Sequence, residues 1–389
     1  MKNFTIRVSL YGNTGNIMMM YLSALKLQSD LGYGSICNVR IPLFDISIPD
    51  IDTRNQFGLH DTEVINSRVH GRVSTDGYCH IVPRSNAAFI SLEGYSQHID
   101  NFPDRRITDY DKIFPYCSDN EQYGGPDDLV INIRGGEVLT GLHPDYTMLP
   151  PEFYEHLIQK TGKKPIFYGQ LTPSPYLDEL KQRFPDARFI SSRGEALDFD
   201  YIRRSHYIVP ALSTFSWLAA WLSDARKIFF PVAGVMSPQQ HPSSMLLPLD
   251  DPRYEFYVFP IYHSRAIANY RDYLDPVRRT WQYVPAASIL QKRQSNRPTL
   301  NDALSVFSVA DYLGMYGDIG LFGTYGAVGS INHFCSAGFW EGKHPVHLDN
   351  KYYATAYPAA AMDVAMGRYD TLLDHYILVG SKMGYTPRA

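Results

Sequence analysis

Between residues 127 and 231 the chain repeats one pattern, in which a short apolar segment of strand composition is followed by a helical segment. The predicted strands cover residues 129–133, 165–168, 188–190, 207–209 and 227–230, and the predicted helices cover residues 152–160, 175–184, 199–204 and 215–224. Such alternation predicts a parallel β-sheet whose strands are joined by crossover helices. The helix from residue 175 begins with Ser174 as N-cap and a proline in its first position. The expected fold class is α/β.

The last repeat of this pattern places hydroxyl side chains where a strand turns into a helix. Ser213, Thr214 and Ser216 lie at this turn, and the helical stripe that follows carries two tryptophans. A helix N-terminus presents unpaired N–H groups and the positive end of the helix dipole, and a Ser or Thr there either caps the helix or binds a phosphate oxygen. The residues alone leave both uses open.

An arginine follows the first of these predicted strands. The strand over residues 129–133 leads into Arg134, Gly135, Gly136 and Glu137. Ligands of α/β sheets bind at the carboxyl ends of the strands, and a guanidinium group binds phosphate oxygens bidentately while staying charged. Arg134 is therefore either a phosphate clamp or one half of a surface ion pair with Glu137.

A glycine-rich turn follows the predicted strand over residues 4–10 and opens a helix over about residues 17–27. Glycines let a ligand approach the backbone closely. The turn lacks the third glycine of a dinucleotide fingerprint and the lysine of a P-loop. Taken by itself it is compatible with an ordinary tight loop.

Four blocks of the chain resemble, in order, motifs of the glycosyltransferase family 11 fucosyltransferases. The matching residues are Gly12, Gly15, Asn16, Met18 and Tyr21; Leu92, Gly94, Tyr95 and Gln97; Arg134 and Glu137; and Asp198, Ser213, Thr214, Phe215, Ser216, Trp217, Ala220, Trp221 and Leu222. The chain departs from the family pattern at Asn132, Gly135, Ser205, Ala211 and Leu212, where the family has His, a second Arg, Cys, Ser and Asn.

The resemblance implies an inverting transfer of L-fucose from GDP-fucose to a hydroxyl of a saccharide acceptor. It implies the GT-B architecture, with two Rossmann-like domains that face a cleft. We expect an acceptor-side domain at residues 1–125, a donor-binding domain at residues 126–295 and a small helical module at residues 296–389. No cofactor besides the donor substrate and no metal are expected. Residues 198–200 spell Asp-Phe-Asp, but they align with the acidic position of a metal-free family.

The resemblance also assigns roles to residues. Arg134 is the group expected to neutralise the departing diphosphate. From their place in the loop after the Arg134 strand, Glu137 is the first candidate for the general base and His143 the second, with Glu137 equally open to orienting Arg134. Asp198 is expected to meet the guanine or ribose, or else to be a structural cap. The predicted donor-binding residues are Gly15, Asn16, Asn132, Arg134, Asp198, Ser213, Thr214 and Phe215. The predicted acceptor-binding residues are Tyr95 and Gln97.

Composition agrees with a cytoplasmic enzyme. The 389 residues carry a net charge of −4 and have a pI near 6.3, which argues against a protein built to coat nucleic acid. No signal peptide and no membrane span stand out, although peripheral attachment to a membrane stays open. The cysteines Cys37, Cys79, Cys117 and Cys335 are too far apart for a zinc or redox motif. We expect them to be reduced residues of the core.

The segment beyond residue 296 contains a tandem duplication with a period of roughly 42 residues. Tyr312, Tyr316, His333, Phe334, Gly338, Gly342 and Pro345 recur as Tyr353, Tyr357, His375, Tyr376, Gly380, Gly384 and Pro387. Such a period predicts a helical unit that packs against its copy, and both histidines are expected to pack rather than to bind metal. The units resemble repeats attached to bacterial surface-polysaccharide glycosyltransferases. They are predicted to serve oligomerisation or docking, or else to contribute acceptor contacts.

Two alternatives to fucosyl transfer stay open. The altered positions fit a transferase that uses another GDP-6-deoxyhexose. The chain also fits a catalytically inactive saccharide- or protein-binding relic, in which part of the 14% aromatic content stacks on carbohydrate.

Overall fold

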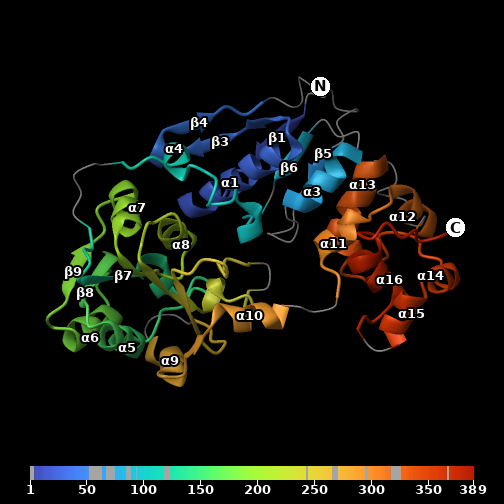
Figure 1. Cartoon of the computed structure of the whole chain (residues 1–389). Helices are drawn as coiled ribbons and strands as arrows, with labels where there is room; N and C mark the ends of the chain where they lie inside the picture. Colours follow the sequence, from blue (N-terminus) through green and yellow to red (C-terminus); the bar gives the residue numbers. More distant parts are fainter. Residues whose placement is uncertain are drawn as a thin grey trace.

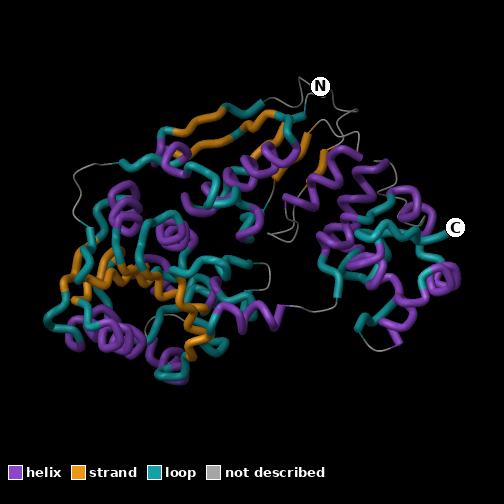
Figure 2. The backbone as a smooth tube through the Cα atoms, in the orientation of Figure 1, coloured by secondary structure: helices purple, strands orange, loops and turns teal. Residues whose placement is uncertain are grey.

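The structure is a computed structural model, which describes residues 4–51, 64–66, 75–84, 89–92, 94–117, 123–241, 244–264, 270–293, 297–316, 326–365 and 368–389. It is a mixed α/β protein with two main sheets (Figures 1 and 2). The larger sheet and its helices lie at the lower left of Figure 1, the smaller sheet lies above them, and the C-terminal helices lie at the right.

The larger sheet has seven strands in the order β13-β12-β11-β10-β7-β8-β9. The strands are β7 (Asp128–Arg134), β8 (Lys164–Gln170), β9 (Arg188–Ser191), β10 (Tyr207–Val209), β11 (Lys227–Val232), β12 (Tyr254–Val258) and β13 (Gln282–Val284). Every neighbouring pair is parallel except β12 with β13. The apolar residues of β7 and β8 are almost wholly buried, as expected for strands covered on both faces.

The crossover helices are α5 (Pro151–Thr161), α6 (Pro175–Arg183), α7 (Glu195–Arg204) and α8 (Thr214–Trp221). The predicted alternation of strands and helices is thus confirmed, with boundaries that differ by a few residues. Ser174 caps α6 by accepting a hydrogen bond from the backbone N–H of Leu177, and Pro175 opens the helix, as predicted. In Figure 1, α7 and α8 lie on the face of the sheet that is turned toward the smaller sheet, and α5 and α6 lie on the other face.

The strand order reverses direction between β7 and β10. The chain runs from β7 outward through β8 to β9, and then returns to the opposite side of β7 with β10. In open α/β sheets, such a switch point leaves a crevice at the carboxyl ends of the two strands. Arg134 ends β7, and the turn with Ser213 follows β10. Topology therefore brings both predicted phosphate-binding groups to one crevice.

The smaller sheet has four strands in the order β2-β1-β6-β5, and all of its pairs are parallel. The strands are β1 (Thr5–Val8), β2 (Ser35–Cys37), β5 (Val64–Asn66) and β6 (Phe89–Leu92), with a separate antiparallel pair β3 (Val39–Ile41) and β4 (Ile46–Ile48). Residue 88, which the sequence assigned to the strand of β6, lies outside the described residues. The helices of this part are α1 (Thr14–Leu31), α3 (Thr75–Ile81) and α4 (Tyr110–Ile113), with 3-10 turns at Pro42–Phe44, Val82–Arg84 and Ile99–Asn101.

A buried arginine connects the segment after the smaller sheet to the larger one. Arg203 of α7 has no exposed surface, donates a hydrogen bond of 2.5 Å to the carbonyl oxygen of Phe114, and forms an ion pair with Asp111. Its guanidinium group also lies 4.2 Å from the ring centroid of Tyr116. Removal of one partner of such a buried charge is strongly destabilising, so these contacts fix α4 against α7.

The chain continues after β11 through shorter elements. These are the 3-10 turns Gly234–Met236 and Asp275–Val277 and the helices α9 (Tyr270–Leu274) and α10 (Ala286–Arg293), and a further 3-10 turn, Gly136–Thr140, follows β7. The predicted domain boundary at residues 295 and 296 lies outside the described residues.

From residue 300 onward, every described regular element is a helix. These elements are α11 (Leu300–Ser305), α12 (Val309–Met315), α13 (Gly326–His333), a π-helical turn at Phe334–Gly338, α14 (Asn350–Ala356), α15 (Pro358–Ala365), α16 (Leu372–His375) and a second π-helical turn at Tyr376–Gly380. In Figure 1, α11 and α13 lie beside α3 and β5. Leu300 and Leu304 of α11 are buried in the same core as both sheets, whereas Tyr353 and Tyr376 belong to a separate small core.

The two sequence copies make the same contacts. The hydroxyl of Tyr312 lies 2.8 Å from Nδ1 of His333, and the hydroxyl of Tyr353 lies 3.1 Å from Nδ1 of His375. A Cβ atom on Gly338 would stand 2.2 Å from the first hydroxyl oxygen. The duplicated residues therefore form a packed Tyr-His-Gly unit. Within the described residues, no group of three or more His, Cys, Asp or Glu side chains is arranged to hold a metal ion.

One prediction about the cysteines is wrong. Cys37 and Cys335 are buried and Cys79 is half-buried, but Cys117 is exposed. Its backbone N–H donates a 2.6 Å hydrogen bond to the buried carboxylate of Asp200, and its Sγ lies 3.6 Å from the carbonyl oxygen of Leu43. Among the described residues, no helix has the length and apolar character that a membrane span requires.

Candidate active site

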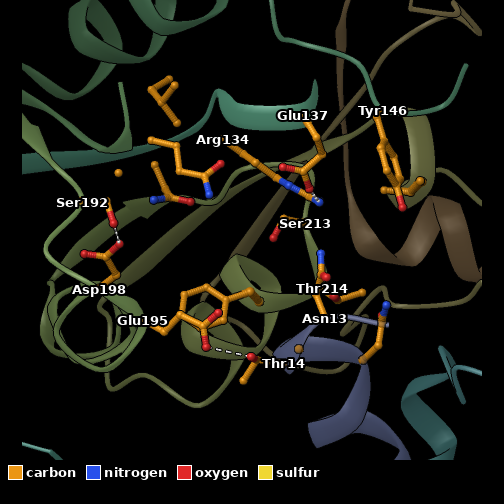
Figure 3. Close-up of a pocket in the computed structure, with 18 of the residues that line it drawn as sticks. Asn13, Thr14, Arg134, Glu137, Tyr146, Ser192, Glu195, Asp198, Ser213 and Thr214 are labelled. Atoms are coloured by element: carbon orange, nitrogen blue, oxygen red, sulfur yellow. Dashed lines mark hydrogen bonds and ion pairs between the residues drawn. The ribbon is translucent and has the colours of Figure 1, made fainter. Parts of the chain in front are cut away.

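A cavity of about 570 Å³ opens at the switch point of the seven-stranded sheet (Figure 3). Its wall is built from the start of α1, the segment after β6, the ends of β7 and β8, the loop before α7 and the start of α8. The volume falls in the range that small-molecule sites occupy. All twelve site residues predicted from the sequence line this cavity: Gly15, Asn16, Tyr95, Gln97, Asn132, Arg134, Glu137, His143, Asp198, Ser213, Thr214 and Phe215. Their individual roles stay predictions.

Arg134 is held from two sides at the end of β7. It forms an ion pair with Glu137, and its guanidinium group lies 5.1 Å from the ring centroid of Tyr146. Only 18% of its side chain is exposed. Burial raises the pKa of the Glu137 carboxyl, but the hydrogen bond and charge of Arg134 outweigh burial, and the pKa is lowered from its ordinary value. This direction keeps Glu137 ionised at neutral pH and paired with Arg134.

The start of α8 faces the same cavity. Ser213 is its N-cap, and its hydroxyl oxygen accepts a hydrogen bond of 3.3 Å from the backbone N–H of Ser216. The hydroxyl oxygen of Ser216 in turn accepts a 2.9 Å hydrogen bond from the backbone N–H of Ala211, which fixes the turn. Capping uses the oxygen of Ser213, and its O–H group can still donate to a ligand. Figure 3 shows Ser213 and Thr214 on the same side of the cavity as Arg134.

The start of α1 lines the cavity next to the start of α8. Gly12 has a φ of +83°, in the left-handed region that favours glycine. The N-cap residue Asn13 makes no side-chain capping bond, and Asn13, Thr14, Gly15 and Asn16 all line the cavity. Gln97 donates a 3.1 Å hydrogen bond from Nε2 to Oδ1 of Asn16, which joins the second resemblance block to the first. The N-termini of α1 and α8, which lie far apart in the sequence, thus meet at one cavity.

Asp198 lines the cavity, but its carboxylate is engaged by the protein itself. It accepts hydrogen bonds from the Tyr168 hydroxyl at 2.6 Å, from the Ser192 hydroxyl at 2.5 Å and from the backbone N–H of Arg193 at 2.9 Å. These contacts shape the loop before α7 and favour the structural interpretation of Asp198. Asp200 has no exposed surface and does not line the cavity.

At residue 135, where the family pattern has a second arginine, the structure has room only for glycine. A Cβ atom on Gly135 would stand 2.4 Å from the backbone oxygen of Gln170, and a Cβ atom on Gly136 would stand 2.8 Å from Oε1 of the same residue. Asn132 donates a 3.1 Å hydrogen bond from Nδ2 to the backbone oxygen of Tyr168. The departures from the family pattern at Asn132 and Gly135 thus accompany a close approach of β7 and β8.

The sequence analysis missed eleven of the residues that line the cavity, among them Thr14, Tyr146, Glu195 and His241. Thr14 donates a 2.7 Å hydrogen bond from Oγ1 to Oε2 of Glu195, which joins α1 to α7 beside the cavity (Figure 3). The place of Glu195 after a predicted strand was a usable signal. No pattern in the sequence pointed to His241, because it lies in an irregular loop after β11.

Comparisons with known proteins give little beyond this geometry. No protein-family model matches the chain, and no curated protein matches it significantly. Among solved structures, the chain is similar to the crystal structure of a glycosyl transferase family 9 protein from Veillonella parvula DSM 2008, with 11% sequence identity and a TM-score of 0.33 over 78% of this chain and 94% of that one. A likeness at this level does not assign a function.

Proposed function

We propose that this protein is a glycosyltransferase that takes its sugar from a nucleoside-diphosphate donor bound in the cavity at the switch point. The observation that carries this proposal is the position of Arg134, which ends β7 in the same cavity wall that holds the start of α8. A guanidinium group and a helix N-terminus are both binding groups for phosphate. Two of the expected diphosphate ligands therefore lie together although nearly 80 residues separate them in the chain.

The chemistry follows from the leaving group. When the bond between the sugar and the diphosphate breaks, negative charge develops on the β-phosphate, and the protein must stabilise it. Arg134 and the donors of the turn from Ser213 to Phe215 fit this task. The arrangement needs no reorganisation at the moment of reaction, because Glu137 and Tyr146 already hold the guanidinium group in place.

The finer assignment rests on the resemblance to family 11. It proposes GDP-fucose as the donor, a saccharide hydroxyl as the acceptor, inversion at the sugar carbon and a GT-B arrangement of the two sheets around the cavity. Glu195 supports a nucleotide donor, since a carboxylate accepts hydrogen bonds from ribose hydroxyls or from a guanine edge. The proposed location is the cytoplasm, where thiols such as those of Cys37, Cys117 and Cys335 stay reduced.

Release of GDP from a panel of GDP-sugars, in the presence of a mixture of saccharide acceptors, tests this proposal. Release from GDP-fucose that is lost in Arg134→Ala supports fucosyl transfer. Release only from another GDP-6-deoxyhexose keeps the transferase and replaces the donor. Binding of GDP without release from any GDP-sugar would instead identify a saccharide- or protein-binding relic.

A further inference from the structure

Asp145, a buried carboxylate next to the cavity residues His143 and His241, is close to three histidines. Only 12% of the Asp145 side chain is exposed. Nδ1 of His263 lies 3.2 Å from its Oδ1, Nδ1 of His241 lies 3.7 Å from its Oδ2, and Nδ1 of His143 lies 4.0 Å from its Oδ2. Gln240 also donates a 2.8 Å hydrogen bond from Nε2 to Oδ1. All three rings therefore turn the same nitrogen toward one carboxylate.

His143 has the wrong tautomer for a base directed at the cavity. Its Nδ1 accepts a 3.1 Å hydrogen bond from the backbone N–H of Asp145. A nitrogen that accepts carries the lone pair, so the proton of neutral His143 is on Nε2. Neutral His143 therefore donates at Nε2 and has no lone pair there with which to take a proton.

His241 has the opposite arrangement. Its Nδ1 is within ion-pair distance of Asp145, so a proton on Nδ1 is favoured and Nε2 becomes the basic nitrogen. Its ring lines the cavity, whereas that of His263 does not. The turn around it is fixed by a 2.7 Å hydrogen bond from the His241 backbone N–H to the carbonyl oxygen of Ser237.

We infer that His241, oriented by Asp145, is the general base that takes the proton of the acceptor hydroxyl, an assignment that rests on the proposed transferase function. The acceptor oxygen forms a bond to C1 of the sugar as the bond between C1 and the β-phosphate oxygen breaks. The hydroxyl proton passes to Nε2 of His241. The electron pair of the broken bond leaves with the nucleoside diphosphate, whose negative charge Arg134 stabilises. Asp145 then balances the positive charge of the His241 imidazolium. The imidazolium afterwards releases the proton to solvent.

The test compares His241→Gln with His263→Gln as a matched control, because His263 contacts the same carboxylate outside the cavity wall. Two quantities are measured: kcat for GDP release from GDP-fucose with saccharide acceptors, and the Kd of GDP by calorimetry. General bases contribute about 10² to 10⁴ in rate. We expect a loss of that size in H241Q, near-normal kcat in H263Q and an unchanged Kd in both.

Rescue separates a base from a structural ring. In His241→Ala, added imidazole should restore part of the lost rate, because a small base can enter the space that the ring leaves. Unchanged kcat in H241Q, an equal loss in H263Q, or no rescue by imidazole overturns the assignment. If the unmodified protein binds no GDP and releases none from any GDP-sugar, the proposed function itself fails. If it turns over and H241Q turns over as fast, only the role of His241 fails.

Discussion

A Cβ atom placed on Gly15 would stand 2.5 Å from the backbone nitrogen of Phe215 and 2.8 Å from Oγ1 of Thr214. The start of α1 and the start of α8 therefore touch through a contact that only glycine permits. Because the obstructing atoms include backbone, no side-chain rotation relieves the clash. The contact makes one cavity wall from two segments that lie almost 200 residues apart.

Gly15→Ala should separate the two helix starts. We expect a loss of about 1–3 kcal/mol in the free energy of unfolding, as for other overpacked positions, and weaker binding of GDP. Gly314→Ala is the control, since Gly314 lies in a helix and has nothing within 4 Å of an added Cβ. Chemical denaturation and calorimetry measure both effects. Unaltered stability and GDP affinity in G15A would show that the contact does not hold the site together.

The sequence was sufficient for five of the seven strands of the larger sheet, but not for β12 and β13, and for part of the cavity wall, for a physical reason. Apolar runs and helix caps are local signals, so the alternation after residue 127 and the capping role of Ser174 were predicted correctly. The place of Arg134 followed from its position at a strand end. Non-local packing was not predictable in this way: the need for glycine at residue 135 depends on the Gln170 backbone, and His241 reaches the cavity from an irregular loop.

The C-terminal part shows the same limit. Its tandem repeat was visible as a pattern of Tyr, His and Gly, and the contacts of the two copies correspond. What the copies pack against was not visible. The buried face of α11 lies against α3, and Tyr312 and Phe334 of the first copy belong to the core that also contains both sheets.

Glu137→Gln distinguishes an orienting residue from a base. The lowered pKa of the Glu137 carboxyl keeps it ionised and paired with Arg134 down to pH values below the ordinary value of about 4.3. We expect E137Q to lower kcat by about tenfold or less through a less ordered Arg134, with weaker GDP binding. A loss of 10² or more in kcat with unchanged GDP affinity would instead make Glu137 the base. Since a lowered pKa adds stability only above the ordinary value, any stability from this pair should disappear as the pH falls through the lowered pKa.

Activity should persist in EDTA. The groups expected at the diphosphate are Arg134 and helix N–H donors, while the carboxylate of Asp198 is occupied by three protein donors and that of Asp200 is buried away from the cavity. GDP release is measured before and after chelation, with magnesium and manganese added back. Abolition by EDTA with recovery on adding either ion would contradict this account of the site.

The effect of truncation on GDP affinity and thermal stability should depend on where the repeat is cut. Removal of residues 349–389 takes away the second copy, whose small core is separate, and should leave GDP affinity within a few-fold of the full chain. Removal from residue 300 also takes away α11, which packs on α3 with Leu300 and Leu304 only 3% and 0% exposed. This longer cut therefore exposes α3 and should lower the thermal stability clearly. If the second copy serves assembly, the shorter cut also changes the oligomeric state, which light scattering measures. Loss of transfer with intact GDP binding would instead indicate acceptor contacts from the repeat.

The most direct measurement is a calorimetric titration of GDP into the unmodified protein, Arg134→Ala and Arg134→Lys. A charge-assisted clamp on a diphosphate contributes about 1.5–3 kcal/mol, which corresponds to roughly 10- to 100-fold in Kd. The account predicts binding to the unmodified protein at one site, a loss of that size in R134A, and little recovery in R134K, because an ammonium group does not reproduce the planar fork. Absence of GDP binding, or equal affinity in R134A, would contradict the assignment of the cavity as a donor site.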